Sequence, residues 1–217
     1  CANDSYSLIP KSSAMKPFKF IVFFSGLERS LANSAYNLRQ DECKAAGLSL
    51  LAYAGLEYGK FKDTVLRDVP RDVFEKFSTR LPEPFRRRAT HFFTEYERVQ
   101  MGVKAWKAGD IEAYGRLVFE SGRSSIENYE CGCPELISLY EIMTHTDGIY
   151  GGRFSGAGFK GCCMSIVDSD KAESVIETVT KEYLAIYPEL EGKYMAAVCD
   201  SADGVDLGGG LGRGLGR

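Results

Sequence analysis

The segment Gly151-Gly-Arg-Phe-Ser-Gly-Ala-Gly-Phe-Lys-Gly161 and the apolar run that follows it, Cys162-Cys-Met-Ser-Ile-Val167, decide the fold. The segment contains a G-x-G-x-x-G pattern at Gly156, Gly158 and Gly161. A dinucleotide-binding fingerprint opens a helix, and a Walker loop ends in Gly-Lys-Ser/Thr. Neither condition is met here, because the residues after the last glycine have the composition of a strand. We therefore predict a strand, a glycine-rich loop and a second strand.

This glycine-rich loop has two interpretations. With little side-chain bulk and several free N–H groups, it would let the backbone approach a ligand closely, as a phosphate site requires. A plain hairpin turn that needs positive φ angles explains the same glycines equally well.

Patterns outside the loop predict the remaining elements. Apolar runs indicate strands at 18–25, 149–154, 162–167 and 194–199. Helical spacing indicates helices at about 35–54, 72–79, 84–108 and 134–144, one that Asp110 can cap, and one from Ser169 or Asp170 to just before Pro188. This order is typical of an α+β domain with a small antiparallel sheet covered on one face by helices.

The helix at 84–108 carries an apolar stripe whose members recur at steps of four, three, four and three residues. We expect this stripe to face the core. Its members are Phe92, Tyr96, Val99, Val103 and Trp106.

Composition excludes several classes of protein. A net charge of −3 and a pI near 5.6 argue against a nucleic-acid-binding protein, which needs a concentrated positive field. The longest compact apolar run, at 20–24, is far shorter than the roughly 20 residues of a membrane span. We expect a cytoplasmic monomer with no nucleic-acid or membrane partner.

The seven cysteines are an odd number without regular spacing, which favours reduced and mostly buried thiols over a disulfide framework. Cys131-Gly-Cys133 and Cys162-Cys163 are not C-x-x-C pairs, and the chain has only two histidines. We therefore assign no metal ligand.

Three segments together resemble the galactokinase branch of the GHMP sugar kinases. Gly151 to Cys163 is similar to that superfamily's third motif, "TGAGFGGC". Glu120 to Leu136 is similar to "S-x-x-S-x-x-x-x-Y-x-x-S-C-P-E-L", and Ser34 to Cys43 to "Y-x-x-R-x-x-E-C". The doubled Cys162-Cys163 and the run Ser125-Ile-Glu-Asn-Tyr-Glu-Cys131 resemble galacturonokinase more than galactokinase.

The resemblance implies an ATP-dependent kinase that uses Mg²⁺ to phosphorylate the anomeric hydroxyl of galacturonate or galactose. By the same resemblance, Tyr36 corresponds to a tyrosine that binds the sugar. Ser155, Gly156, Ala157 and Gly158 correspond to an active-site loop, called the third-motif loop below. Recurrent family positions are also matched by Arg39, Glu42 and Arg123, whose charges partners within the fold would explain equally well.

The family's sugar-binding signature, its Gly/Ser-rich phosphate loop and its catalytic aspartate have no match in this sequence. We therefore assign no catalytic residue, and we expect ATP and Mg²⁺ to be held mostly by an N-terminal half. We expect 1–30 to be a remnant of an N-terminal domain strand and its linker, 31–200 to be the C-terminal domain, and 201–217 to be a disordered glycine-rich tail. On this interpretation the chain alone is inactive. The alternative is a catalytically dead ligand-binding or regulatory module of the same fold.

Overall fold

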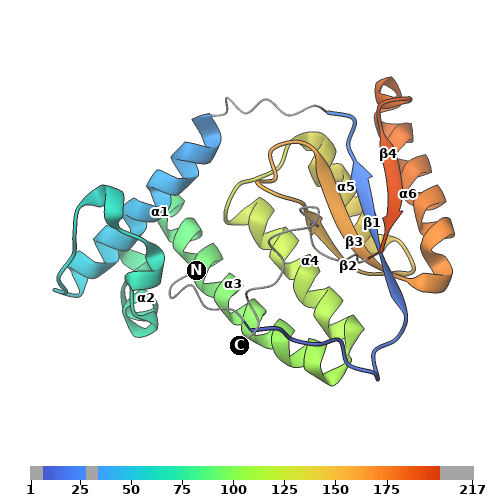
Figure 1. The fold of residues 1–217 in the computed structure, drawn as a ribbon. Coiled ribbons are helices and arrows are strands. Elements are labelled where there is room, and N and C mark those ends of the chain that lie inside the picture. Colours follow the sequence, from blue (N-terminus) through green and yellow to red (C-terminus); the bar gives the residue numbers. More distant parts are fainter. Residues whose placement is uncertain (1–6, 28–33, 201–217) are drawn as a thin grey trace, which may run out of the picture.

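The computed structural model describes residues 7–27 and 34–200. Its strands form one antiparallel sheet in the order β2-β3-β1-β4 (Figure 1). The strands are β1 Phe18–Phe24, β2 Ile149–Phe154, β3 Cys162–Asp168 and β4 Met195–Cys199. The α-helices are α1 Ser34–Tyr53, α2 Arg71–Phe77, α3 Glu83–Ala108, α4 Ile111–Glu127, α5 Pro134–His145 and α6 Ala172–Ile186. The α+β prediction is confirmed.

Helices pack on both faces of the sheet. Successive side chains of a strand point to opposite sides, so each strand contributes to both contacts. On one face, Ile21 and Phe23 of β1 are fully buried in a cluster with α5 and α6. On the other face, Phe20 packs with Trp106 of α3 and Tyr114 of α4. The expectation that helices cover a single face was therefore wrong.

Strand β1 belongs to the middle of this sheet. It pairs with β3 from Phe18↔Asp168 to Phe24↔Cys162, and with β4 along its other edge. The predicted domain boundaries, including the assignment of 1–30 to a remnant of an N-terminal domain, stay predictions, and 201–217 lies outside the described residues.

A second core lies apart from the sheet, where α1 and α2 pack against the first half of α3 (Figure 1). Helix α3 runs from this lobe to the sheet and joins the two. The buried members of this core include Ala46, Leu50, Val73, Ala89 and Phe93.

The apolar stripe of α3 is not core along its whole length. Tyr96 is 63% exposed and Val99 58% exposed, although Trp106 at the C-terminal end packs beside the sheet. The prediction was wrong at these two positions because α3 turns a polar stripe, described below, toward α4.

The glycine-rich loop joins the antiparallel strands β2 and β3, as predicted. Gly156 and Gly158 have φ angles of 76° and 77°, in the left-handed region that glycine adopts without steric cost. The N–H of Ser155 donates to the carbonyl oxygen of Cys162 at 2.9 Å and closes the hairpin. No helix begins after Gly161, so the dinucleotide-fingerprint interpretation stays excluded.

Candidate functional site

Arg88 of α3 connects two of the three motif-like segments. Its side chain is 1% exposed. Its Nε donates to Glu42 Oε2 at 2.6 Å, its Nη1 to the carbonyl oxygen of Asn128 at 2.5 Å, and its Nη2 to Glu130. A buried guanidinium needs such partners, because an unpaired charge is strongly disfavoured in an apolar interior. Arg88 therefore ties α1 to the turn after α4.

Arg39 strengthens this connection from the side of α1. Its Nη1 donates to Glu42 Oε2 at 3.2 Å and its Nη2 to the carbonyl oxygen of Glu130 at 3.4 Å. Glu130 has a φ angle of 54°, which is unfavourable for a residue with a side chain. The hydrogen bond from Arg88 lowers the pKa of Glu130, so its carboxylate stays charged. The ion pairs hold Glu130 in this conformation.

The third-motif loop packs against the same turn. A Cβ built on Gly158 would lie 2.8 Å from Phe154 Cδ2 and 3.2 Å from Cys131 Cβ. The three motif-like segments therefore form one continuous set of contacts from α1 through Glu130 and Cys131 to the loop. Sequence reasoning found the segments but missed Arg88, which joins the first two.

Tyr36 lies near the start of α1 and is 44% exposed. Its hydroxyl accepts a hydrogen bond from Gln40 Nε2 at 3.2 Å. Among the described residues no hydrogen bond joins Tyr36 to the third-motif loop. Helix α1, which carries Tyr36, is connected to the turn beside the loop through Arg39, Glu42 and Glu130. Arg123 is exposed on α4 beside the hydroxyl of Tyr140.

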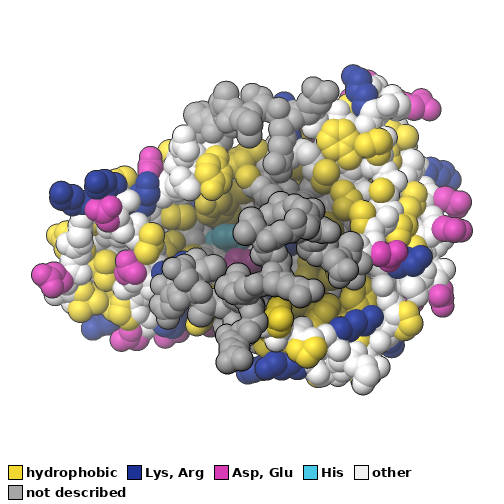
Figure 2. Space-filling model, in the orientation of Figure 1, with side chains coloured by type: hydrophobic (Ala, Val, Ile, Leu, Met, Phe, Trp, Pro, Cys, Tyr) yellow, Lys and Arg dark blue, Asp and Glu magenta, His cyan; other side chains and the backbone are white. Residues whose placement is uncertain are grey.

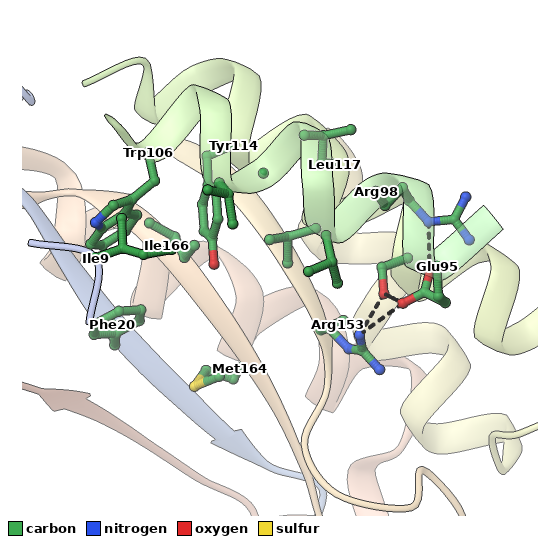
Figure 3. Close-up of a pocket in the computed structure, with 15 residues that line it drawn as sticks. Ile9, Phe20, Glu95, Arg98, Trp106, Tyr114, Leu117, Arg153, Met164 and Ile166 are labelled. Atoms are coloured by element: carbon green, nitrogen blue, oxygen red, sulfur yellow. Dashed lines mark hydrogen bonds and ion pairs between the residues drawn. The ribbon is translucent and has the colours of Figure 1, made fainter. Parts of the chain in front are cut away.

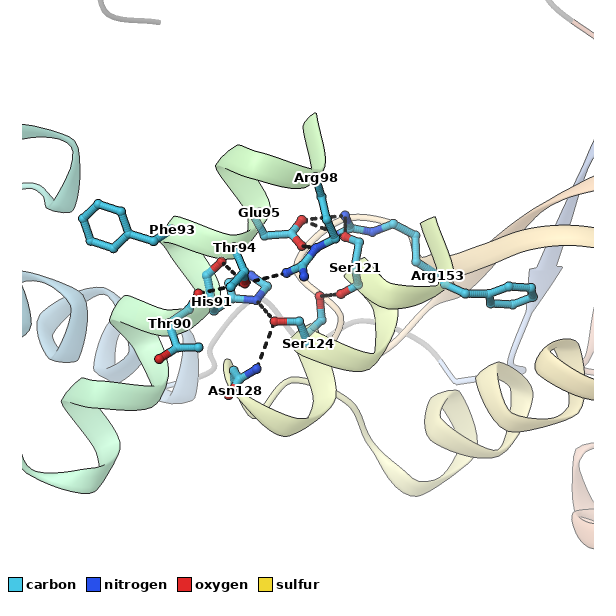
Figure 4. A network of polar contacts seen from close by, with 12 residues as sticks. Thr90, His91, Phe93, Thr94, Glu95, Arg98, Ser121, Ser124, Asn128 and Arg153 are labelled. Carbon is cyan, nitrogen blue, oxygen red and sulfur yellow. Dashed lines mark hydrogen bonds and ion pairs between the residues drawn. The ribbon is translucent and has the colours of Figure 1, made fainter. Parts of the chain in front are cut away.

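A polar stripe of α3 faces α4 and extends the network (Figure 4). His91 Nδ1 lies 2.9 Å from Ser124 Oγ, and Ser121 Oγ donates to Glu95 Oε2 at 2.7 Å. Arg98 Nε donates to Glu95 Oε1 at 2.6 Å. Sequence reasoning overlooked this stripe, although its members Arg88, His91, Glu95 and Arg98 recur at helical steps of three, four and three residues.

The surface is hollowed beside this network. Figure 2 shows the surface hollowed between the lobe of α1 and α2 and the sheet, with histidine and acidic side chains at its floor. One pocket lined by described residues reaches Arg153, two residues before the third-motif loop, but Ser155 to Gly158 do not line it.

Burial lowers the pKa of His91 to about 4, although the nearby Glu95 carboxylate opposes this shift. The unfolded chain therefore binds more protons between about pH 4 and 6.5, so stability is full above this window and falls as the pH decreases through it. We expect the free energy of unfolding to be smaller at pH 4.5 than at pH 7, with about 2 kcal/mol of the loss due to His91. Urea unfolding at both pH values measures this.

His91→Gln should remove that share of the pH dependence. His145→Gln is the matched control, because the His145 side chain is 61% exposed and pairs only with Glu182 among the described residues. Equal pH dependence in the wild type and His91→Gln would contradict a buried neutral His91.

The thiols only partly follow the expectation of buried cysteines. Cys131 and Cys163 are buried, and burial raises the pKa of Cys131 to about 11, which keeps it a thiol. Cys199 is exposed, and Cys43 and Cys133 are half-buried.

Within the described part of the chain, no three His, Cys, Asp or Glu side chains are grouped so that they could hold a metal ion. The same part of the chain contains no helix long and apolar enough to cross a membrane.

Residues 103–185 match the family described as "GHMP kinases C terminal". This part of the chain is therefore a GHMP kinase C-terminal domain. Two of the relatives that the whole chain resembles are a galacturonokinase and a galactokinase. It is 40% identical over 208 residues to the galacturonokinase of Arabidopsis thaliana, covering 94% of this chain and 48% of that protein.

It is 35% identical over 207 residues to the galactokinase of Roseiflexus sp. (strain RS-1), covering 94% of this chain and 49% of that protein. The crystal structure of Lactococcus lactis galactokinase complexed with galactose has the same fold, with a TM-score of 0.75, 24% identity, and coverage of 91% of this chain and 47% of that one. The resemblance inferred from the three segments is confirmed. The chain spans about half the length of the curated relatives that it matches.

Proposed function

We propose that this chain supplies the C-terminal half of the active site of an ATP-dependent sugar 1-kinase. The observation that carries the proposal is the continuous set of contacts between the three motif-like segments, which Arg88 and Glu130 hold together. Phosphoryl transfer depends on positioning and charge stabilisation more than on covalent chemistry. Orienting the sugar would therefore be a sufficient catalytic role for this domain.

On this proposal each part of the wall has its own task. The Tyr36 hydroxyl donates to or accepts from a sugar hydroxyl, and the third-motif loop closes the wall beside it. ATP and Mg²⁺, which kinases of this family use, would be held mainly by polypeptide that precedes this domain in its relatives. Galacturonate is the preferred substrate in our proposal because the similarity to galacturonokinase is greater than that to the galactokinase compared here.

A hybrid enzyme tests the proposal. This chain would be joined to the N-terminal half of the Arabidopsis thaliana galacturonokinase, and ATP-dependent formation of galacturonate 1-phosphate and galactose 1-phosphate would be measured. We expect turnover by the hybrid, with galacturonate preferred.

Tyr36→Phe in the hybrid should raise KM for the sugar about three- to tenfold and change kcat less, because one hydrogen bond to an uncharged hydroxyl is lost. Steady-state kinetics at saturating ATP measure this. Tyr58→Phe is the control, because Tyr58 is also exposed, at 51%, and belongs to no motif. An unchanged KM in Tyr36→Phe would remove Tyr36 from the sugar site.

A further inference from the structure

A pocket lies on the second face of the sheet, where β1 and β3 meet α3 and α4 (Figure 3). Its volume is about 460 Å³, within the range of small-molecule sites. The walls are mostly apolar and include Phe20, Val103, Leu117, Val118, Met164 and Ile166.

The two ends of the pocket differ in chemistry. Trp106 and Tyr114 form an aromatic end, with ring centroids 5.2 Å apart. Arg98, Glu95 and Arg153 form the opposite, polar end, as Figure 3 shows. The pocket is therefore elongated and amphipathic.

The polar end carries an excess of positive charge. Burial disfavours a charged Glu95, but hydrogen bonds from Ser121 and Arg98 hold its pKa below the usual value, so it remains a carboxylate. Two guanidinium groups thus face one carboxylate. Arg153 donates through Nη1 to Ser121 Oγ, and the same nitrogen lies 3.6 Å from Glu95 Oε2. No bond to the described residues uses its Nε or Nη2, and its side chain is 36% exposed.

We propose that this pocket binds an amphipathic monoanion, with an apolar body along the sheet and one carboxylate-like head on Arg153. An apolar body is favoured because contact with these walls removes its surface from water. An acidic head is favoured because Arg153 can offer a carboxylate two parallel N–H donors. A neutral or cationic head would leave the positive charge uncompensated. This inference does not depend on the proposed kinase function.

The chain contains its own probe for this site. Trp106 is the only tryptophan, and it lines the pocket. Decanoate and decyltrimethylammonium would be titrated below their micelle concentrations, and decanol below its solubility limit, while Trp106 fluorescence is followed. We expect a saturable change with decanoate at one molecule per chain, affinity for decanol at least about tenfold weaker, and no saturable change with the cation.

Two variants test the head-group contact. Arg153→Met should weaken decanoate binding about tenfold and leave decanol binding unchanged. Val99 lines the pocket and is 58% exposed, so Val99→Glu would add a negative charge there without disturbing the core. This variant should also weaken the binding of decanoate and leave that of decanol unchanged. Arg116→Met is the control, because Arg116 is exposed on α4 and does not line the pocket. Circular dichroism establishes that each variant is folded.

Three results would overturn the proposal. One is equal affinity for decanoate and decanol. Another is a fluorescence change that does not saturate or that needs several molecules per chain. The third is dimerisation of the chain on binding, measured by light scattering, which would assign the pocket to a second copy.

Discussion

Gly115→Ala should lower the free energy of unfolding by about 3 kcal/mol or more, or prevent folding, because α4 and β2 meet backbone to backbone at this position. A Cβ built on Gly115 would lie 2.1 Å from the carbonyl oxygen of Tyr150 and 2.3 Å from its carbonyl carbon. Gly151 on the strand is equally close, since its Cβ would lie 2.3 Å from the carbonyl oxygen of Gly115. The obstacle on each side is backbone, so no rotamer change can relieve the clash.

Gly102→Ala is the matched control. Gly102 lies inside α3, and its Cβ would meet only the ring of Tyr114, at 3.4 Å, which is ordinary van der Waals contact. Alanine is favoured over glycine in a helix by up to about 1 kcal/mol, so this variant should unfold at the same or a higher urea concentration. Equal losses in the two variants would contradict the close packing of α4 on β2.

Arg88→Met should destabilise the chain by about 3 to 5 kcal/mol, since removing one partner of a buried ion pair leaves the other charge uncompensated. Glu42, 12% exposed, would lose its bond at 2.6 Å. Urea unfolding followed by circular dichroism measures the loss. Arg88→Lys should recover only part of it, because an ammonium group cannot bond Glu42, Glu130 and the Asn128 carbonyl in the geometry of a guanidinium.

Arg86→Met provides the comparison on the same helix. The side chain of Arg86 is 42% exposed and pairs with the exposed Glu83, so its loss should change stability by less than about 0.5 kcal/mol. The double variant Arg88→Met with Glu42→Gln should be less damaged than the sum of its single changes. Additive losses would show that the two side chains do not act as a pair.

Local patterns were sufficient to predict most elements. The strand at 149–154 and the helix at 84–108 lie within one residue of the observed β2 and α3. Asp110 caps α4 as predicted, and its Oδ1 accepts from the Ala113 N–H at 2.8 Å. These features depend on neighbours within a few residues, which a sequence displays directly.

Features that depend on distant partners were missed. The place of β1 between β3 and β4 is set by pairing across more than a hundred residues, which no local period reveals. Helix α3 has both an apolar and a polar stripe, and spacing alone does not tell which of them a neighbouring helix will cover. The choice follows from Glu42, Glu130 and Ser121, which supply partners for the polar stripe.

Only part of the candidate site was predicted from the sequence. Tyr36 and the third-motif loop came from a resemblance, and their roles remain proposals. Arg88 lies outside all three motif-like segments, and its role follows from contacts with residues that are distant in the sequence. Its position explains why segments separated in sequence form one wall.

The most direct test of the kinase proposal measures sugar 1-phosphate formed from ATP when the chain and the separately produced N-terminal half of the Arabidopsis thaliana galacturonokinase are mixed. We expect no product from either half alone and galacturonate 1-phosphate from the mixture. Product from this chain alone would contradict a half-site, and a folded complex of the two halves without product would favour a module that has lost catalysis.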